Sequence, residues 1–126
     1  MNTSRLSLWL SLGFLLPACV QPAHNKTVVY LLDVRGIPNV QQVGLRGRDN
    51  PLSWDQDLPL TPVGNDSSLY RTVVTTRTGY LVTEVKFTVN GEFELQQADN
   101  RRIAFGAPGD TVVYRARFNV AGSLKP

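Results

Sequence analysis

The sequence predicts an all-β fold, a small antiparallel β-sandwich of six to eight strands. Short runs of β-branched and aromatic residues recur along the chain, separated by Gly, Pro, Asn and Asp. No stretch after the N-terminal region shows sustained helical periodicity. Strand-like runs at this spacing are typical of a two-sheet sandwich. We expect one such domain over residues 27–122 and a short C-terminal tail over residues 123–126.

Two segments show the clearest strand pattern. Apolar and polar residues alternate along Thr111–Val120, which predicts an antiparallel strand that is buried on one face. Its expected inward residues are Val112, Tyr114, Ala116, Phe118 and Val120. Val82–Val89 behaves likewise, with Val85, Phe87 and Val89 inward. The remaining expected strands are Thr27–Val34, Val40–Gly47, Leu69–Thr76 and Arg102–Phe105.

The dipeptide Asn90-Gly91 predicts a tight hairpin, because both residues accept the positive φ that a type I′ turn requires. A two-residue turn would pair Thr88 with Phe93. Since cross-strand partners share a face, Phe93 and Leu95 would then lie outward beside Lys86 and form a contact surface. A bulge after Glu92 is the alternative, and it would turn Phe93 back into the core.

The N-terminal region has the pattern of a signal peptide. Arg5 precedes an apolar run of eleven residues, Leu6–Leu16, which is too short to span a bilayer. The tetrapeptide that follows, Leu16-Pro17-Ala18-Cys19, resembles the bacterial lipobox. It implies a signal peptide over residues 1–18, lipidation of Cys19 and a tether over residues 19–26. Acyl chains on Cys19 would then hold the protein on the membrane.

These features predict a location in the bacterial cell envelope. Val20 follows the cysteine in place of Asp, so the usual inner-membrane retention signal is missing. We therefore expect the outer membrane if the host is Gram-negative. The alternative is ordinary signal-peptidase cleavage near Ala18 or Ala23, which would yield a secreted protein.

Composition argues against several classes of function. One cysteine and one histidine cannot form a Cys/His metal cluster, and we expect no metal or other cofactor. The net charge of +3 comes from interspersed basic and acidic residues, which argues against a nucleic-acid partner. Asp55 and Asp57 lie close together, but carboxylates in a polar loop are usually solvated turn residues. We therefore expect that the protein is not an enzyme.

Four segments together resemble the starch- and glycogen-binding modules of carbohydrate-binding module family 20. Val43–Leu60 is similar to the strand, loop and Trp at the start of that family's modules. Leu69–Val74 resembles its "Y-x-x-x-V" strand, Val85–Arg101 its "YKF…G…WE…NR" segment, and Thr111–Val120 its last strand. The segments occur in the family's order and cover most of the chain after the tether. The resemblance implies an immunoglobulin-like sandwich that binds α-glucan without catalysis.

The resemblance also implies a binding site. Trp54 matches the family's stacking Trp, while Lys86 and Asn100 match side chains that contact sugar hydroxyls. The family's second platform Trp is absent, and Phe93 or Leu95 occupies that neighbourhood. A sugar's C–H face can lie flat on an indole while its hydroxyls need polar partners. A Trp packed over the edge of the sandwich is the competing interpretation of Trp54.

Two functions follow from these observations. The first is a membrane-anchored lipoprotein that binds polysaccharide, an α-glucan such as starch or glycogen. The second is a structural or adaptor lipoprotein that keeps the sandwich but binds an envelope protein partner through the outward surface of Phe93, Leu95 and Lys86.

Overall fold

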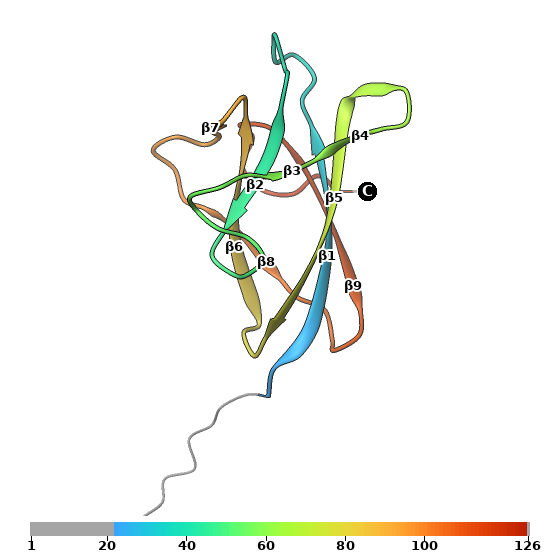
Figure 1. Cartoon of the computed structure of the whole chain (residues 1–126), viewed down its shortest axis with the longest axis vertical. Coiled ribbons are helices and arrows are strands. Elements are labelled where there is room, and N and C mark those ends of the chain that lie inside the picture. The colour runs from blue at the N-terminus through green and yellow to red at the C-terminus, as the bar shows by residue number, and fades with distance from the viewer. Residues whose placement is uncertain (1–21, 126) are drawn as a thin grey trace, which may run out of the picture.

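The computed structural model describes residues 22–125, which form two β-sheets packed face to face (Figure 1). The described part of the chain contains no helix. Its strands are β1 (His24–Asp33), β2 (Val43–Gly47), β3 (Leu58–Pro59), β4 (Thr61–Val63), β5 (Asp66–Thr78), β6 (Val82–Val89), β7 (Glu92–Phe93), β8 (Arg101–Ala104) and β9 (Thr111–Arg117).

The sheet topology confirms the predicted all-β sandwich. One sheet has the order β4-β5-β1-β9, and the other has the order β3-β2-β6-β7, with β8 also paired to β6. The described residues form nine strands rather than six to eight, because β3, β4 and β7 have only two or three residues each. Strands this short leave no alternating pattern in the sequence.

The expectation that Thr111–Val120 is antiparallel is wrong in direction, because β9 pairs with β1 in parallel. The chain reaches β9 from β8, which lies in the opposite sheet. It therefore enters the first sheet at the end where β1 begins. Alternation reports which face of a strand is buried, and it does not report the direction of the neighbouring strand.

The core lies between the sheets and comes from alternate residues of the long strands. Val85 and Phe87 of β6 are fully buried, as the alternation predicts. Tyr30 of β1 is 1% exposed and meets the ring of Phe87 edge-on, with 6.1 Å between the centroids. The ring of Tyr114 of β9 also packs against Tyr30, with 6.3 Å between the centroids.

Both ends of the domain differ from the predicted boundaries. β1 begins at His24, inside the predicted tether, because residues 24–26 pair with Thr76–Thr78 of β5. At the other end, Leu124 N donates to Arg115 O at 2.7 Å, so the predicted tail packs back onto β9. β9 itself ends at Arg117, and Asn119 has a φ of 62°. Val120 is consequently 46% exposed, and its expected inward position is wrong.

The Asn90-Gly91 hairpin is confirmed. Both residues have positive φ, 52° and 81°, and Thr88 pairs with Phe93 without a bulge. The alternative that returns Phe93 to the core is therefore wrong. Phe93 lies half-buried on the outer face of its sheet.

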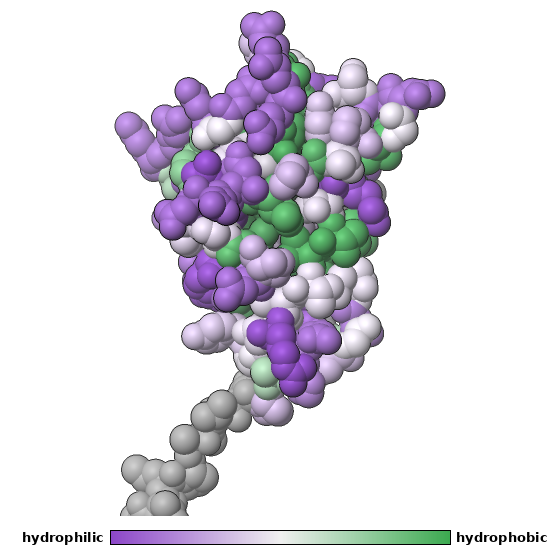
Figure 2. Space-filling view, in the orientation of Figure 1, coloured by the Kyte–Doolittle hydropathy of each residue, from purple (hydrophilic) through white to green (hydrophobic). Residues whose placement is uncertain are grey.

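Hydrophilic residues cover most of the face in Figure 2, and hydrophobic residues gather near its middle. The described residues contain no helix with the length and apolar character needed to cross a bilayer. Cys19 and the predicted signal peptide lie outside the described residues.

Candidate glycan-binding site

A surface loop leaves the second sheet beside the middle of β6. β7 pairs with β6 at Thr88 and Val89, and β8 pairs with its other end, residues 82–85. Because both short strands lie along the same edge, residues 94–100 must arch away between them. Lys86 sits on β6 where this loop leaves the sheet.

An ion pair between Glu94 and Arg101 closes the base of the loop. Arg101 Nε and Nη2 donate to the two carboxylate oxygens of Glu94 at 2.6 and 2.8 Å. The two side chains are 0% and 1% exposed. Glu94 also accepts the backbone N–H of Phe87 at 3.0 Å. Bidentate, charge-assisted bonds of this kind fix geometry strongly, so both ends of the loop are held in place.

The same guanidinium connects the loop to the C-terminal segment. Arg101 donates to the carbonyl oxygens of Arg117, Val120 and Gly122 at 3.0, 2.7 and 2.8 Å. Burial by itself would lower the pKa of Arg101, but its hydrogen bonds to Glu94 and Tyr114 raise the pKa above the ordinary value. Arg101 is therefore a permanent cation with a structural role.

Lys86 holds the far side of the loop. Its Nζ donates to the carbonyl oxygens of Leu95 and Ala98 at 3.0 and 3.1 Å. An ammonium group has three N–H donors, so one is left for a ligand. Lys86 therefore serves the fold of the loop as well as the surface beside it.

Arg46 of β2 positions the segment that contains Trp54. Its Nε donates to Asp57 Oδ1 at 2.6 Å, and its Nη1 donates to the carbonyl oxygen of Trp54 at 3.1 Å. The guanidinium also lies over the ring of Phe93, 4.8 Å from its centroid. Gly44 leaves room for this arrangement, since a Cβ there would come within 2.6 Å of Asp57 Cγ.

The expectation that Asp55 and Asp57 are both solvated is half right. Asp55 is exposed, but the side chain of Asp57 is only 11% exposed and is bound to Arg46. Asp57 packs against a glycine of β2, which a sequence pattern does not reveal. The described residues include no group of three His, Cys, Asp or Glu side chains that could hold a metal ion.

These segments border a shallow, open hollow of about 440 Å³ on the outer face of the second sheet, called here the Trp54 hollow. It is lined by Trp54, Lys86, Phe93, Gln96, Gln97 and Asn100. The rings of Trp54 and Phe93 are tilted by 53°, with 6.5 Å between their centroids. Trp54 is half-buried at the surface and does not belong to the core.

Four of the five predicted binding residues therefore lie together, and Leu95 does not. Leu95 has a φ of 47° and is not among the residues that line the Trp54 hollow. Lys86 Nζ donates a hydrogen bond to the carbonyl oxygen of Leu95. The predicted pairing across the hairpin fails at this point because β7 ends at Phe93. The expected contact surface therefore contains Phe93 and Lys86 but not Leu95.

Sequence reasoning missed the two glutamines and the residues that support the site. Gln96 and Gln97 lie in a loop whose path depends on the buried Glu94–Arg101 pair. Arg46 is a charged residue on the outer face of a strand, and nothing in the sequence indicated that it would contact the Trp54 segment. The one available signal was the alternation itself, since Glu94 follows the outward Phe93 and must therefore point inward.

The arrangement suits a ligand with apolar faces and a polar rim. Two aromatic rings offer stacking surfaces, and an ammonium group and three amides offer donors and acceptors around them. No protein-family model matches the chain, and no curated protein is similar to it.

Proposed function

We propose that this protein is a non-catalytic lipoprotein of the bacterial cell envelope that binds α-glucan at the Trp54 hollow. One observation supports the proposal most: Lys86, Phe93 and Asn100 line a single hollow together with Trp54, which lies much earlier in the sequence. They belong to the segments that resemble starch- and glycogen-binding modules. Lipidation of Cys19 would anchor the domain to the membrane, and the outer membrane is proposed for a Gram-negative host.

The physical basis is the amphipathic character of a glucose unit. Its C–H face is apolar and can stack on the ring of Trp54 or Phe93. Its hydroxyl groups can bond the free N–H of Lys86 and the amide of Asn100. Phe93 presents less ring area than a second tryptophan, so we expect weak binding to short oligosaccharides.

The direct test replaces the larger ring. Trp54→Ala should weaken binding to glycogen and maltoheptaose at least about tenfold, equivalent to about 1.4 kcal/mol. Trp54→Phe should retain part of the affinity, because an aromatic face remains. Affinity electrophoresis in glycogen gels and titration calorimetry measure both effects.

Tyr80→Ala is the matched control, since Tyr80 is a 62% exposed aromatic residue that does not line the hollow. It should bind like the wild type. Wild-type protein that is not retarded by any glucan, or Trp54→Ala protein with unchanged affinity, would contradict the proposal.

The second candidate function is an adaptor that binds another envelope protein. The observation in its favour lies on the opposite sheet, where Val29, Val73 and Val113 of three adjacent strands lie side by side. Val73 and Val113 are 45% and 63% exposed. The glucan experiment separates the two candidates, because an adaptor would show no retardation at all.

A further inference from the structure

Two large apolar side chains stand exposed next to each other at one end of the sandwich. Tyr80 and Leu81 are both 62% exposed and lie in the turn between β5 and β6. β1 begins at the same end, because His24 pairs with Thr78, the last residue of β5. Figure 1 shows this turn beside the start of β1. The turn therefore presents an apolar surface at the end where the chain enters the domain.

The backbone of the β5–β6 turn is fixed by bonds to two other segments. Phe105 N donates to the carbonyl oxygen of Leu81 at 2.9 Å, and Arg48 Nη2 donates to that of Val82 at 2.8 Å. The Arg48 guanidinium also lies over the Tyr80 ring, 4.9 Å from its centroid. These contacts hold the turn in place, so its two exposed side chains keep a fixed position at the end of the domain.

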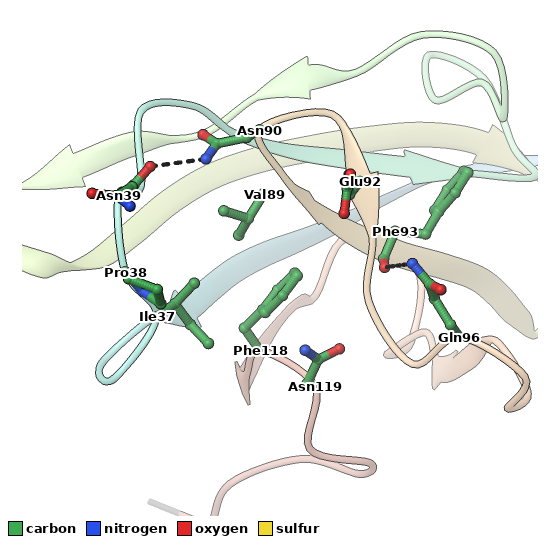
Figure 3. Close-up of a pocket in the computed structure, with 10 residues that line it drawn as sticks. All are labelled: Ile37, Pro38, Asn39, Val89, Asn90, Glu92, Phe93, Gln96, Phe118 and Asn119. Carbon is green, nitrogen blue, oxygen red and sulfur yellow. Dashed lines mark hydrogen bonds between the residues drawn. The ribbon is translucent and has the colours of Figure 1, made fainter.

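The opposite end of the sandwich has a different character. A hollow of about 600 Å³ opens there next to the hairpin, and it is called here the end hollow (Figure 3). Val89 and Phe118, two of its apolar lining residues, are only 6% and 8% exposed. The exposed polar residues Asn39 and Glu92 also line it. The apolar residues of the end hollow are therefore recessed, whereas those of the β5–β6 turn protrude.

The expected lipid anchor lies close to the β5–β6 turn along the chain. His24, the first residue of β1, follows Cys19 by five positions. An extended chain spans at most about 3.6 Å per residue, so this connection reaches at most about 18 Å. Acyl chains on Cys19 would therefore hold this end of the sandwich at the membrane, and a lipid surface is the first surface that the turn meets.

We propose that Tyr80 and Leu81 form a contact with the phospholipid surface that orients the anchored domain. Tyrosine is enriched at the membrane–water interface, where its ring lies among the headgroups. Leu81 can insert between acyl chains, and the exposed Arg77 of β5 can bind a lipid phosphate. Two apolar side chains alone would bind a membrane weakly, but the anchor keeps them at a high local concentration beside it. The inference rests on the lipidation of Cys19 that is part of the proposed function.

This orientation leaves the Trp54 hollow clear of the membrane. β6 begins at Val82 beside the turn, and Lys86, which lines the hollow, lies four positions further along this strand. A strand rises about 3.3 Å per residue, so Lys86 stands up to about 13 Å further from the lipid than Val82. The hollow is then open to a polysaccharide outside the membrane.

The test uses the lipidated protein in phospholipid vesicles, with a nitroxide spin label on the variant Arg77→Cys. The label should collide often with oxygen dissolved in the lipid and rarely with a water-soluble nickel chelate. Adding Tyr80→Ser/Leu81→Ser should lower this collision ratio, because serine side chains do not enter the lipid. The turn keeps its backbone bonds in this variant, so the domain should stay folded. Power-saturation electron paramagnetic resonance measures both collision rates.

Val73→Ser/Val113→Ser is the matched control, because these side chains are 45% and 63% exposed on the outer face of the first sheet. It should keep the high collision ratio. A ratio that fell in this variant and not in the turn variant would mean that the domain lies on its valine face, which would overturn the inference. A label that is shielded from the chelate without more oxygen collisions would indicate a protein partner and would overturn it as well.

Glycogen binding separates this inference from the α-glucan proposal. Tyr80→Ser/Leu81→Ser should bind glycogen like the wild type, since the two side chains line neither the Trp54 hollow nor the end hollow. An unchanged collision ratio in this variant would overturn the membrane contact alone. Cys19 without acyl chains, seen by mass spectrometry of the mature protein, would overturn both the lipid anchor of the proposed function and this inference.

Discussion

At the scale of single residues, the candidate site depends on side chains that a ligand need not touch. Arg46 is bound to Asp57, to the Trp54 carbonyl and to the face of Phe93. Its planar group presents several N–H donors in a fixed geometry, and a lysine ammonium cannot reproduce this fork. Arg46 is accordingly a positioning residue for Trp54.

Replacing Arg46 by Lys should separate positioning from charge. We expect Arg46→Lys to weaken glucan binding several-fold, because the Trp54 segment loses its fixed contact. The free energy of unfolding should fall by only about 1 kcal/mol, since the charge opposite Asp57 remains. Glycogen affinity and urea unfolding measure the two effects.

Arg48→Lys is the control, because Arg48 contacts Asp49 and the ring of Tyr80 outside both hollows. If the two variants changed glucan affinity equally, Arg46 would have no special role in holding Trp54.

At the scale of elements, the loop of residues 94–100 depends on the Glu94–Arg101 pair. Removing one partner of a buried pair leaves a charge without compensation, which costs about 3–5 kcal/mol. The pair also joins β7, β8 and the C-terminal segment. A substitution in the pair therefore removes contacts that hold three parts of the chain together.

We expect Glu94→Gln and Arg101→Met each to lower the free energy of unfolding by about 3 kcal/mol or more. The double variant should lose less than the sum, because the two side chains interact directly. Urea unfolding of the four proteins gives the coupling energy.

Arg35→Met provides a comparison, since Arg35 is paired with Asp33 but its side chain is 65% exposed. Its effect should be much smaller. Additive effects of Glu94→Gln and Arg101→Met would contradict the assigned role of the buried pair.

At the scale of the whole molecule, the two sheets meet at Tyr30. Burial, followed by the charges of Tyr114 and Asp49, raises the pKa of Tyr30 above its ordinary value. In the unfolded chain a tyrosine ionises at about pH 10. The folded protein keeps Tyr30 neutral at that pH, so stability is present below about pH 10 and is lost as the pH rises further.

The melting temperature should therefore fall between about pH 9 and pH 11.5. Tyr30→Phe should reduce this slope, because a phenylalanine cannot ionise in the unfolded chain. Tyr80→Phe, a change at an exposed position, should leave the slope as it is. Calorimetric scans across the pH range measure all three proteins. Parallel curves for wild-type and Tyr30→Phe protein would exclude Tyr30 as the source.

The sequence left the position of Phe93 open between the outer face and the core, but it predicted the two-sheet sandwich and the Asn90-Gly91 hairpin. Each of these depends on local rules, namely alternation along a strand and positive φ in a turn. The ordered resemblance to starch-binding modules also indicated Trp54, Lys86 and Asn100, which line one hollow.

The arrangement of these pieces could not be predicted from the sequence. The parallel pairing of β9, the displacement of Leu95 and the positions of Gln96 and Gln97 all depend on contacts between residues distant in the sequence. The Glu94–Arg101 pair shapes the loop, and Arg46 holds Trp54 beside Phe93. The identity of a charged residue does not reveal whether it lies in a solvated turn or in a buried ion pair. Its role depends on a partner that is distant in the sequence and lies beside it only in the folded chain.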